Sequence, residues 1–310
     1  MISLDEAWRR LEPHLDPLPA ARVPRREALG RVLAAPLAAA ADLPPADVSA
    51  MDGFAVAGPL AEGDARPVAG VVAAGDPPGR ALPAGAALRV MTGAPVPAGA
   101  DRVIPFELAD EAEGTVRFRE VPAAGSHLRR RGEVTRAGQP LLPAGTLVGP
   151  EALALAASQG AVELAVHRPP RVAVLTTGDE VVPPEAEPPP GGLRDSHTDF
   201  LLAAGRGLGL ASTPLGIAPD DREALAERVA AGLAGHDVLV VGGGVSAGDF
   251  DFVEEVLAAA GCAKLFDAVA IQPGKPLVAA VRAGGAAAER RLVFGLPGNP
   301  ASVMVTWRLV

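Results

Sequence analysis

Arg291-Leu292-Val293-Phe294-Gly295-Leu296-Pro297-Gly298-Asn299-Pro300 is an apolar run that stops in a turn of prolines and glycines. A helix-like segment, residues 301–310, follows this turn. Because proline fixes φ and glycine frees it, the turn has a specified shape rather than mere flexibility. Ligands of open α/β sheets bind just outside the carboxyl ends of the strands. The segment therefore predicts a strand, a shaped loop and a helix, with a ligand site beside the loop.

The same alternation of apolar runs and helical segments begins after residue 170 and continues to the turn. Strands are predicted over residues 172–175, 213–217, 238–241 and 292–294, and helices over residues 197–208, 220–233 and 252–260. This alternation is typical of a mainly parallel sheet with helices on both faces, which is a three-layer α/β domain. A proline-rich tract at residues 183–192 predicts an extended surface loop within this domain.

The part of the chain before residue 170 has a different pattern. Ser3 and Glu6 form a capping box before an apolar segment, and a second helix is predicted over residues 25–33. From about residue 40 to residue 138, short apolar runs alternate with proline and glycine clusters, which predicts a small β domain. Residues 149–160 again favour a helix. We therefore expect a multidomain α/β protein in which a helical region carries an inserted β domain.

Composition argues against several classes of protein. The 310 residues include 28 basic and 37 acidic side chains, a net charge of −9, with no long basic run, which argues against nucleic-acid or anionic-membrane partners. We find neither a signal peptide nor an apolar stretch long enough to cross a bilayer. The single Cys262 excludes an intrachain disulfide framework, and we interpret it as a small apolar residue near a helix end. A cytoplasmic protein is expected.

Three loops at predicted strand ends carry the polar residues of the α/β part. They are residues 176–180, residues 242–251 with three successive glycines, and the turn at 297–300. Glycine loops before a helix present unpaired N–H groups that suit phosphate, and carboxylates beside phosphate favour Mg²⁺ between them. Each loop by itself is better explained as a tight turn, or as carboxylates that stabilise a helix start. Three such loops at one sheet edge together favour a ligand site.

Seven motifs resemble, in order, those of the molybdopterin molybdotransferases of molybdenum cofactor biosynthesis, the family that includes the gephyrin E domain. They are Ser49-Ala50-Met51-Asp52-Gly53-Phe54-Ala55-Val56, Met91-Thr92-Gly93-Ala94-Pro95-Val96-Pro97, Arg129-Arg130-Arg131-Gly132-Glu133, Thr177-Gly178-Asp179-Glu180, Gly243-Gly244-Val245-Ser246-Ala247-Gly248-Asp249, Pro273-Gly274-Lys275-Pro276 and Leu296-Pro297-Gly298-Asn299-Pro300. Because they extend from residue 49 to residue 300, the resemblance covers essentially the whole chain.

The resemblance implies three regions and a homodimer. Residues 1–38 and 139–169 would form a helical linking and dimerisation region, residues 39–138 the inserted β domain, and residues 170–310 the molybdopterin-binding α/β domain. In such proteins the site lies between the binding domain of one subunit and the inserted domain of the other. A molybdopterin adenylyltransferase is the implied upstream partner.

The implied reaction transfers molybdenum from molybdate to adenylated molybdopterin, with Mg²⁺-assisted release of AMP. The resemblance assigns catalytic roles to Asp52, Thr92, Glu180, Asp220 and Asp251, substrate binding to Gly243, Gly244, Ser246, Lys275, Pro297 and Pro300, and Mg²⁺ binding to Glu180, Asp249 and Asp251. Carboxylate oxygens suit Mg²⁺, and a lysine can supply positive charge to phosphate or molybdate. Asp52 and Thr92 have an alternative role as braces of their own turns, and Lys275 as a solvated surface residue.

The sequence departs from the family's pattern at several positions. Val134 stands where an aspartate is common, Gln272 where a basic residue is frequent, and His197 where asparagine is usual. Relatives also continue into a C-terminal β domain, so this sequence is expected to be either a truncated or an unusually short member. Two alternative functions stay open at this point: a molybdopterin adenylyltransferase-like nucleotide enzyme, and a non-catalytic pterin-binding scaffold.

Overall fold

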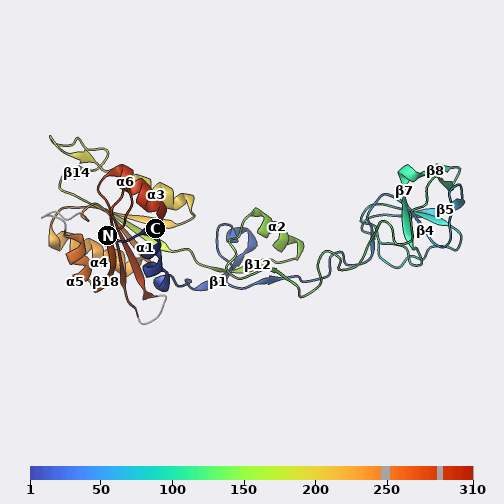
Figure 1. Cartoon of the computed structure of the whole chain (residues 1–310), viewed down its shortest axis with the longest axis horizontal. Coiled ribbons are helices and arrows are strands. Elements are labelled where there is room, and N and C mark those ends of the chain that lie inside the picture. Colours follow the sequence, from blue (N-terminus) through green and yellow to red (C-terminus); the bar gives the residue numbers. More distant parts are fainter. Residues whose placement is uncertain (246–251, 285–288, 310) are drawn as a thin grey trace. The chain divides into compact units, whose positions relative to one another are not determined.

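The computed structural model describes residues 1–245, 252–284 and 289–309. The chain divides into two compact units, whose elements are labelled in Figure 1. Unit 1 comprises Met1–Ala34, Gly145–Leu153 and Glu163–Val310, and unit 2 comprises Ala35–Ala144 and Ala154–Val162. The division into a helical linking region, an inserted β domain and a binding domain stays a prediction.

Within the described residues, unit 1 contains a six-stranded sheet with the strand order β16-β13-β17-β20-β19-β18. The strands are β13 (Arg171–Thr177), β16 (Ala211–Ala218), β17 (Val238–Gly242), β18 (Cys262–Ala268), β19 (Pro276–Arg282) and β20 (Arg291–Leu296). The strands β16, β13, β17 and β20 are parallel, and β19 and β18 extend the sheet in antiparallel fashion. The predicted α/β class with a parallel-rich sheet is confirmed.

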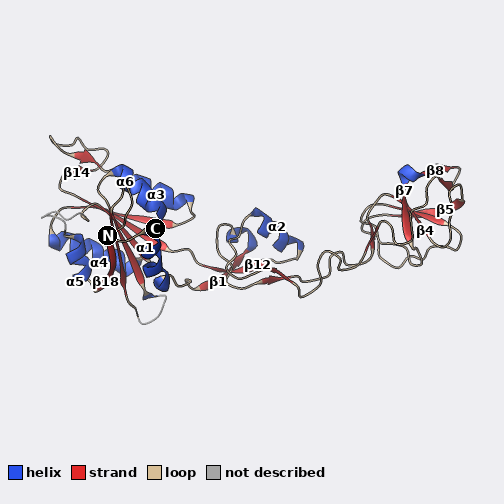
Figure 2. Ribbon diagram, in the orientation of Figure 1, coloured by secondary structure: helices blue, strands red, loops and turns tan. Residues whose placement is uncertain are grey.

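Helices cover both faces of this sheet (Figure 2). They are α1 (Leu4–Leu11), α3 (His197–Gly207), α4 (Arg222–Gly235), α5 (Val253–Ala259) and α6 (Pro300–Thr306). Helices α1, α3 and α6 share one core with the strand residues Val172 and Val240, whereas α4 and α5 share the other core with Ala173 and Leu239. Neighbouring strand residues enter opposite cores because side chains alternate along a strand. The result is the three-layer arrangement that the sequence predicts.

The strands β18 and β19 are not predicted by the sequence. Gly261, at a φ of +79°, follows α5, and Cys262 then begins β18. The interpretation of Cys262 as a helix residue is therefore wrong, because short alanine-rich runs do not distinguish helix from strand by their periodicity. The Cys262 thiol is buried, and this burial raises its pKa.

Unit 1 also contains a two-stranded antiparallel sheet of β1 (Ala20–Pro24) and β12 (Glu163–His167), which lie far apart in the sequence. The helix predicted over residues 25–33 is wrong. A short 3₁₀ turn at Arg25–Ala28 is followed by Gly30 at a φ of +74°, a conformation that ends a helix. The next residues pair with a distant segment instead, since Leu33 N–H donates to the Thr146 carbonyl at 2.9 Å.

Among its described residues, unit 2 contains a second six-stranded sheet, with the order β7-β4-β6-β5-β9-β8. The strands are β4 (Gly53–Val56), β5 (Ala65–Val72), β6 (Ala87–Val90), β7 (Arg102–Pro105), β8 (Ala109–Ala112) and β9 (Thr115–Phe118). One core contains Phe54, Ile104 and Phe118, and a second contains Leu88 and Val103. The predicted β structure of this segment is thus present in the fold.

The remaining elements are short. They are β2 (Leu37–Ala38), β3 (Val48–Ser49), β10 (Leu128–Arg129), β11 (Pro140–Leu142), α2 (Pro150–Ser158), β14 (Val181–Val182) and β15 (Leu193–Arg194), with 3₁₀ turns at Glu12–His14, Phe106–Leu108 and Trp307–Leu309. The pair β14–β15 flanks the proline-rich tract at residues 183–192. None of the helices in the described part of the chain is long and apolar enough to cross a membrane.

Candidate functional site

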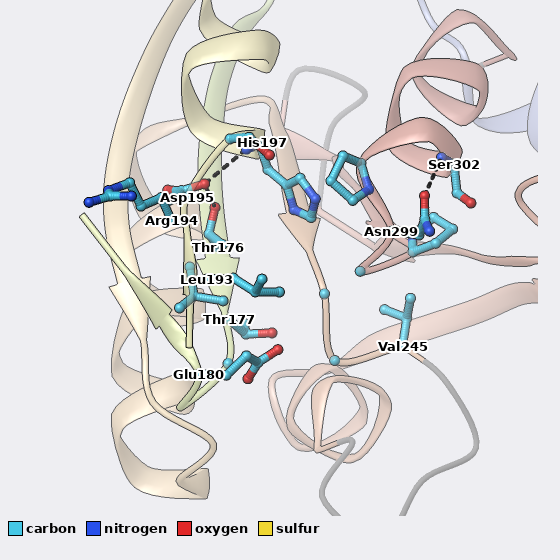
Figure 3. A pocket seen from close by; sticks show the side chains of 18 of the residues that line it. Thr176, Thr177, Glu180, Leu193, Arg194, Asp195, His197, Val245, Asn299 and Ser302 are labelled. Carbon is cyan, nitrogen blue, oxygen red and sulfur yellow. Dashed lines mark hydrogen bonds between the residues drawn. The ribbon is translucent and has the colours of Figure 1, made fainter. Parts of the chain in front are cut away.

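A pocket of about 440 Å³ lies at the carboxyl ends of β13, β17 and β20 (Figure 3). Three loops form most of it: residues 176–181, residues 243–245 and the turn at 297–300. The start of α3 and the strand β15 form a further wall. Because β13, β17 and β20 are parallel neighbours, their ends meet at one edge of the sheet. The loops that the sequence singled out are therefore brought together.

Asp195 holds the start of α3 at the pocket wall. Its Oδ1 accepts hydrogen bonds from the backbone N–H groups of His197 at 2.9 Å and Thr198 at 3.1 Å. The hydroxyl of Thr198 donates to Oδ2 at 2.6 Å. These bonds satisfy the first N–H groups of the helix in the manner of an N-cap. The buried carboxylate of Asp195 is thus committed to the architecture of the pocket.

Gly243 and Gly244 pack directly on Thr177. They adopt φ values of +96° and +65°, which L side chains rarely adopt. A Cβ added to Gly243 would lie 2.8 Å from the Thr177 carbonyl oxygen, and one added to Gly244 would lie 2.8 Å from Thr177 Oγ1. Both the conformation and the space therefore require glycine here. The Thr177 hydroxyl is buried and has no hydrogen-bond partner among the described residues.

The turn after β20 is fixed at both ends. At its start, Gly243 N–H donates to the Leu296 carbonyl at 3.0 Å, which joins the glycine loop to the turn. At its end, the Asn299 side chain accepts from Ala301 N–H at 2.9 Å and caps α6. Pro297 and Pro300 line the pocket between these anchors, and their contact with substrate stays a prediction.

The carboxylates Glu180 and Asp220 also line this pocket. Asp220 N–H donates to Asp179 Oδ1 at 3.0 Å, and Asp179 N–H donates to Asp220 Oδ2 at 3.4 Å. The Glu180 carboxylate lies beside Gly178, where an added Cβ would be 2.6 Å from Oε2. Lys275 is exposed, and its neighbour Pro276 lines the pocket instead. The role of Lys275 stays a prediction.

Of the three predicted Mg²⁺ ligands, only Glu180 lies within the described residues. Ser246, Asp249 and Asp251 lie outside the described residues. Within residues 1–245, 252–284 and 289–309, no group of three or more His, Cys, Asp or Glu side chains is placed to hold a metal. The Mg²⁺ site of Glu180, Asp249 and Asp251 therefore stays a prediction, as does the substrate contact of Ser246.

Asp52 and Thr92 lie together on exposed loops of unit 2. The backbone N–H and the hydroxyl of Thr92 both donate to Asp52 Oδ1, at 2.6 Å and 2.7 Å. The backbone bond, followed by the hydroxyl bond, lowers the pKa of Asp52. The geometry thus shows the turn-bracing role, and the catalytic roles of both residues stay predictions.

Thr177, Asp195 and His197 are among the pocket residues that had no site role in the sequence analysis. An Asp before a helix is an N-cap signal, so Asp195 could have been recognised from its position. Burial lowers the pKa of His197 below its usual range, although Asp195 and a backbone hydrogen bond with Gly298 act in the opposite direction. No pattern in the sequence indicates that this histidine is buried.

Two family models match this chain. Residues 173–310 match a model described as a probable molybdopterin binding domain, and this is the class of α/β domain to which the sheet of unit 1 belongs. Residues 2–160 match the MoeA N-terminal region, domains I and II. The chain therefore belongs to the MoeA family of molybdopterin molybdenumtransferases, enzymes of molybdenum cofactor biosynthesis.

Individual relatives agree with this assignment. The chain is 42% identical over 303 residues to the molybdopterin molybdenumtransferase of Synechococcus elongatus. The aligned region covers 94% of this chain and 73% of the relative. It is 31% identical to that of Staphylococcus aureus, over 99% of this chain and 74% of the relative. The molybdopterin biosynthesis MoeA protein of Pyrococcus horikoshii has a similar structure, with a TM-score of 0.79 and 31% identity over 100% of this chain and 78% of that chain.

Replacing Gly243 by alanine is expected to weaken pterin binding by at least about tenfold, because the strained φ and the close Thr177 carbonyl both oppose a Cβ. The affinity for molybdopterin, measured by fluorescence titration, tests this. Gly235→Ala is the control, since nothing lies within 4 Å of its added Cβ and its φ is not positive. Equal affinities of the two variants would show that the Gly243 loop does not contribute to molybdopterin binding.

Proposed function

We propose that this protein transfers molybdenum from molybdate to adenylated molybdopterin, with Mg²⁺-dependent release of AMP. The pocket at the sheet edge is the observation that supports this best, because glycine backbone, carboxylates and a proline turn meet there. Glycine loops favour phosphate through their N–H groups, which Gly244 would supply here because the Gly243 N–H is bonded to the Leu296 carbonyl. Carboxylates at the same rim need a cation between them and phosphate. A pocket of about 440 Å³ is also of the size that holds a small cofactor.

The reaction consists of two exchanges. Water adds to phosphorus in the phosphoanhydride, the P–O bond to the leaving group breaks, and AMP is released. Both dithiolene sulfurs of the pterin bind molybdenum, and their two S–H protons leave with one oxygen of molybdate as water, with no change of oxidation state. The glycine loop and the proline turn would hold the pterin phosphate and ring while these exchanges take place.

The carboxylates at the pocket suit Mg²⁺, because Glu180 and Asp220 offer the hard oxygen donors that this cation prefers. When bound, Mg²⁺ neutralises phosphate charge and polarises the reacting phosphoryl group. We assign Glu180 to this cation, together with the predicted ligands Asp249 and Asp251. Asp220 N–H is held by Asp179, which keeps the Asp220 loop beside the β13 loop.

The proposal includes a homodimer in which Asp52 and Thr92 of the β-rich part contribute to the reaction. It also includes a molybdopterin adenylyltransferase as the supplier of the adenylated pterin. The resemblance of the seven motifs supports these points. Sedimentation of the purified protein tests the dimer directly, and a monomer at micromolar concentration would remove it from the proposal.

Glu180→Gln is expected to slow AMP release by about 100-fold while pterin binding changes little, because it removes a carboxylate ligand of the proposed Mg²⁺ that acts on the reacting phosphate. Purified protein is incubated with adenylated molybdopterin, molybdate and Mg²⁺, and both AMP and bound molybdenum are measured. Glu185→Gln is the matched control, since Glu185 is exposed and does not line the pocket.

Each alternative function has its own result in this assay. Unchanged AMP release in Glu180→Gln would remove Glu180 from the reacting site. Wild-type protein that binds the pterin but releases no AMP would be a non-catalytic scaffold. In a separate incubation with molybdopterin and ATP in place of the adenylated substrate, formation of adenylated molybdopterin would indicate an adenylyltransferase instead.

A further inference from the structure

The two carboxylates of the pocket come from loops that follow different strands. Glu180 follows β13, and Asp220 follows β16, the strand that lies beside β13 in the sheet. The pairing of these strands ends at Ala218, and Gly178 N–H then donates to the Ala218 carbonyl at 3.2 Å. Pro219 comes next and has no N–H with which to continue the ladder. The sheet pairing therefore ends before either carboxylate is reached.

Asp179 connects the two loops where the sheet pairing ends. Its Oδ1 accepts a hydrogen bond from Asp220 N–H at 3.0 Å, and its own N–H donates to Asp220 Oδ2 at the longer distance of 3.4 Å. The shorter bond joins residues that are 41 positions apart, so it holds one loop against the other. On the helix side, Asp221 caps α4 by accepting from the N–H groups of Glu223 and Ala224. The backbone around Asp220 is thus anchored on both sides.

Asp179 and Asp220 contribute to different cavities. Asp220 is half-buried and lines the 440 Å³ pocket together with Glu180. Asp179 is exposed and lines a neighbouring cavity of about 520 Å³ instead. The side chain of Asp179 therefore acts on the pocket through the Asp220 backbone rather than by contact with a molecule bound in the pocket.

We propose that Asp179 is a positioning residue for AMP release: by accepting the Asp220 N–H, it keeps the Asp220 carboxylate at the pocket rim beside the Glu180 loop. The inference rests on the proposed function, because it takes this pocket to be the reacting site. The task needs an acceptor oxygen and not a charge, so a neutral side-chain amide can perform it. Since each carboxylate accepts from the backbone of the other residue, their like charges repel, and the charge of Asp179 does not favour the contact.

Two substitutions separate the acceptor oxygen from its charge. Asp179→Asn keeps an oxygen in the same place and removes the charge, whereas Asp179→Ala removes both. Asp179→Ala is expected to lower kcat for AMP release about tenfold, the effect of one hydrogen bond, with little change in KM for the adenylated pterin. Asp179→Asn is expected to stay within about twofold of the wild type, because it keeps this bond.

Asp76→Ala is the matched control for these kinetics. Asp76 also accepts a backbone N–H, that of Ala73 at 2.8 Å, but it lies in an exposed turn of unit 2. Loss of a similar bond away from the pocket should leave AMP release unchanged. The comparison therefore separates the position of the bond from the general effect of removing an aspartate that braces a turn.

Hydrogen–deuterium exchange without ligand tests the bond itself. The peptide that covers residues 218–222 contains the Asp220 N–H, which should exchange about tenfold faster in Asp179→Ala than in the wild type. In Asp179→Asn this N–H should keep its protection. Unchanged exchange in the alanine variant would overturn the proposal, because the bond would then not hold the loop.

The kinetic results have equally distinct meanings. AMP release that is as slow in Asp179→Asn as in Asp179→Ala would overturn the proposal and assign the charge of Asp179 to the reaction. Wild-type kcat in Asp179→Ala would refute the inference alone and leave the proposed function standing. A wild type that binds the pterin but releases no AMP would refute the proposed function, and the positioning role would be refuted with it, even if the exchange measurement showed that Asp179 holds the loop.

Discussion

Replacing Asp237 by asparagine is expected to destabilise unit 1 by about 3 kcal/mol, because this carboxylate is buried and accepts several charge-assisted hydrogen bonds. Its two oxygens accept from the Arg168 guanidinium at 2.6 Å and 2.8 Å. Arg171 donates to Asp237 through its backbone N–H at 2.9 Å. The carboxylate thus joins the start of β17 to the start of β13 and to the segment before it.

The same contacts determine how Asp237 responds to pH. Burial raises the pKa of this carboxyl, but the bonds from Arg168 and Arg171 together outweigh burial and hold the pKa well below its usual range. A carboxyl whose pKa is lowered on folding stabilises the protein above its unfolded pKa, and this contribution is lost as the pH falls below about 4. The asparagine variant should therefore lose less stability than the wild type on acidification.

Tryptophan fluorescence can follow this change selectively. The two tryptophans, Trp8 and Trp307, both lie in unit 1, and the chain has no tyrosine. Urea unfolding followed by tryptophan emission should give a clearly lower midpoint for Asp237→Asn. Glu255→Gln is the control, because its ion pair with Arg222 is about 60% exposed on both sides and should contribute less than about 1 kcal/mol. Equal midpoints would show that the Asp237 contacts do not stabilise the fold.

Replacing Gly53 by alanine is expected to destabilise unit 2 by at least about 3 kcal/mol, since the added Cβ would overlap with backbone rather than with a flexible side chain. Gly53 begins β4, which lies between β6 and β7. Its Cβ would lie 2.2 Å from the Ile104 carbonyl oxygen and 3.0 Å from Pro105 Cα. Strand β7 would have to move away from β4, which would break the sheet next to the Asp52 turn.

Unit 2 has no tryptophan, so hydrogen–deuterium exchange read by mass spectrometry is the appropriate measurement. Peptides that cover β4, β6 and β7 should lose protection in Gly53→Ala, whereas the tryptophan transition of unit 1 should not move. Gly207→Ala is the control, because nothing lies within 4 Å of its added Cβ and alanine is favoured within a helix. Unchanged protection in β4 would mean that the sheet tolerates the extra carbon.

Local patterns were sufficient to predict much of unit 1. The helices α3, α4 and α5 and the four parallel strands follow from hydrophobic runs bounded by glycine and proline, and their order requires a parallel sheet. The antiparallel strands β18 and β19 could not be predicted in this way, because bulges interrupt the alternation of β18 and residues 277–281 of β19 are all buried. The helix predicted over residues 25–33 is wrong because residues of this segment form backbone hydrogen bonds with a segment far away in the sequence, which local patterns do not reveal.

In the candidate site, too, local patterns predicted some features, whereas others depend on segments that are distant in the sequence. Glycines and carboxylates after predicted strands indicated the edge of the sheet, and the structure places Glu180, Asp220, Gly243 and Gly244 in one pocket there. The close approach of the glycines to Thr177 depends on two strands that are separate in sequence. The motif that begins at Thr177 marked this loop, but no local pattern indicated that Thr177 packs on the glycines.

The sequence by itself determined the βα alternation, the motifs that place the chain in its family, and the shaped Leu296–Pro300 turn at a strand end, because these depend on residues close together in the chain. Only the tertiary structure decided which polar groups are buried and what faces them. Asp237 meets Arg168 across 69 residues, and His197 meets Gly242 at the end of another strand. Burial and hydrogen-bond partners are properties of the packed chain, so no local pattern could reveal them.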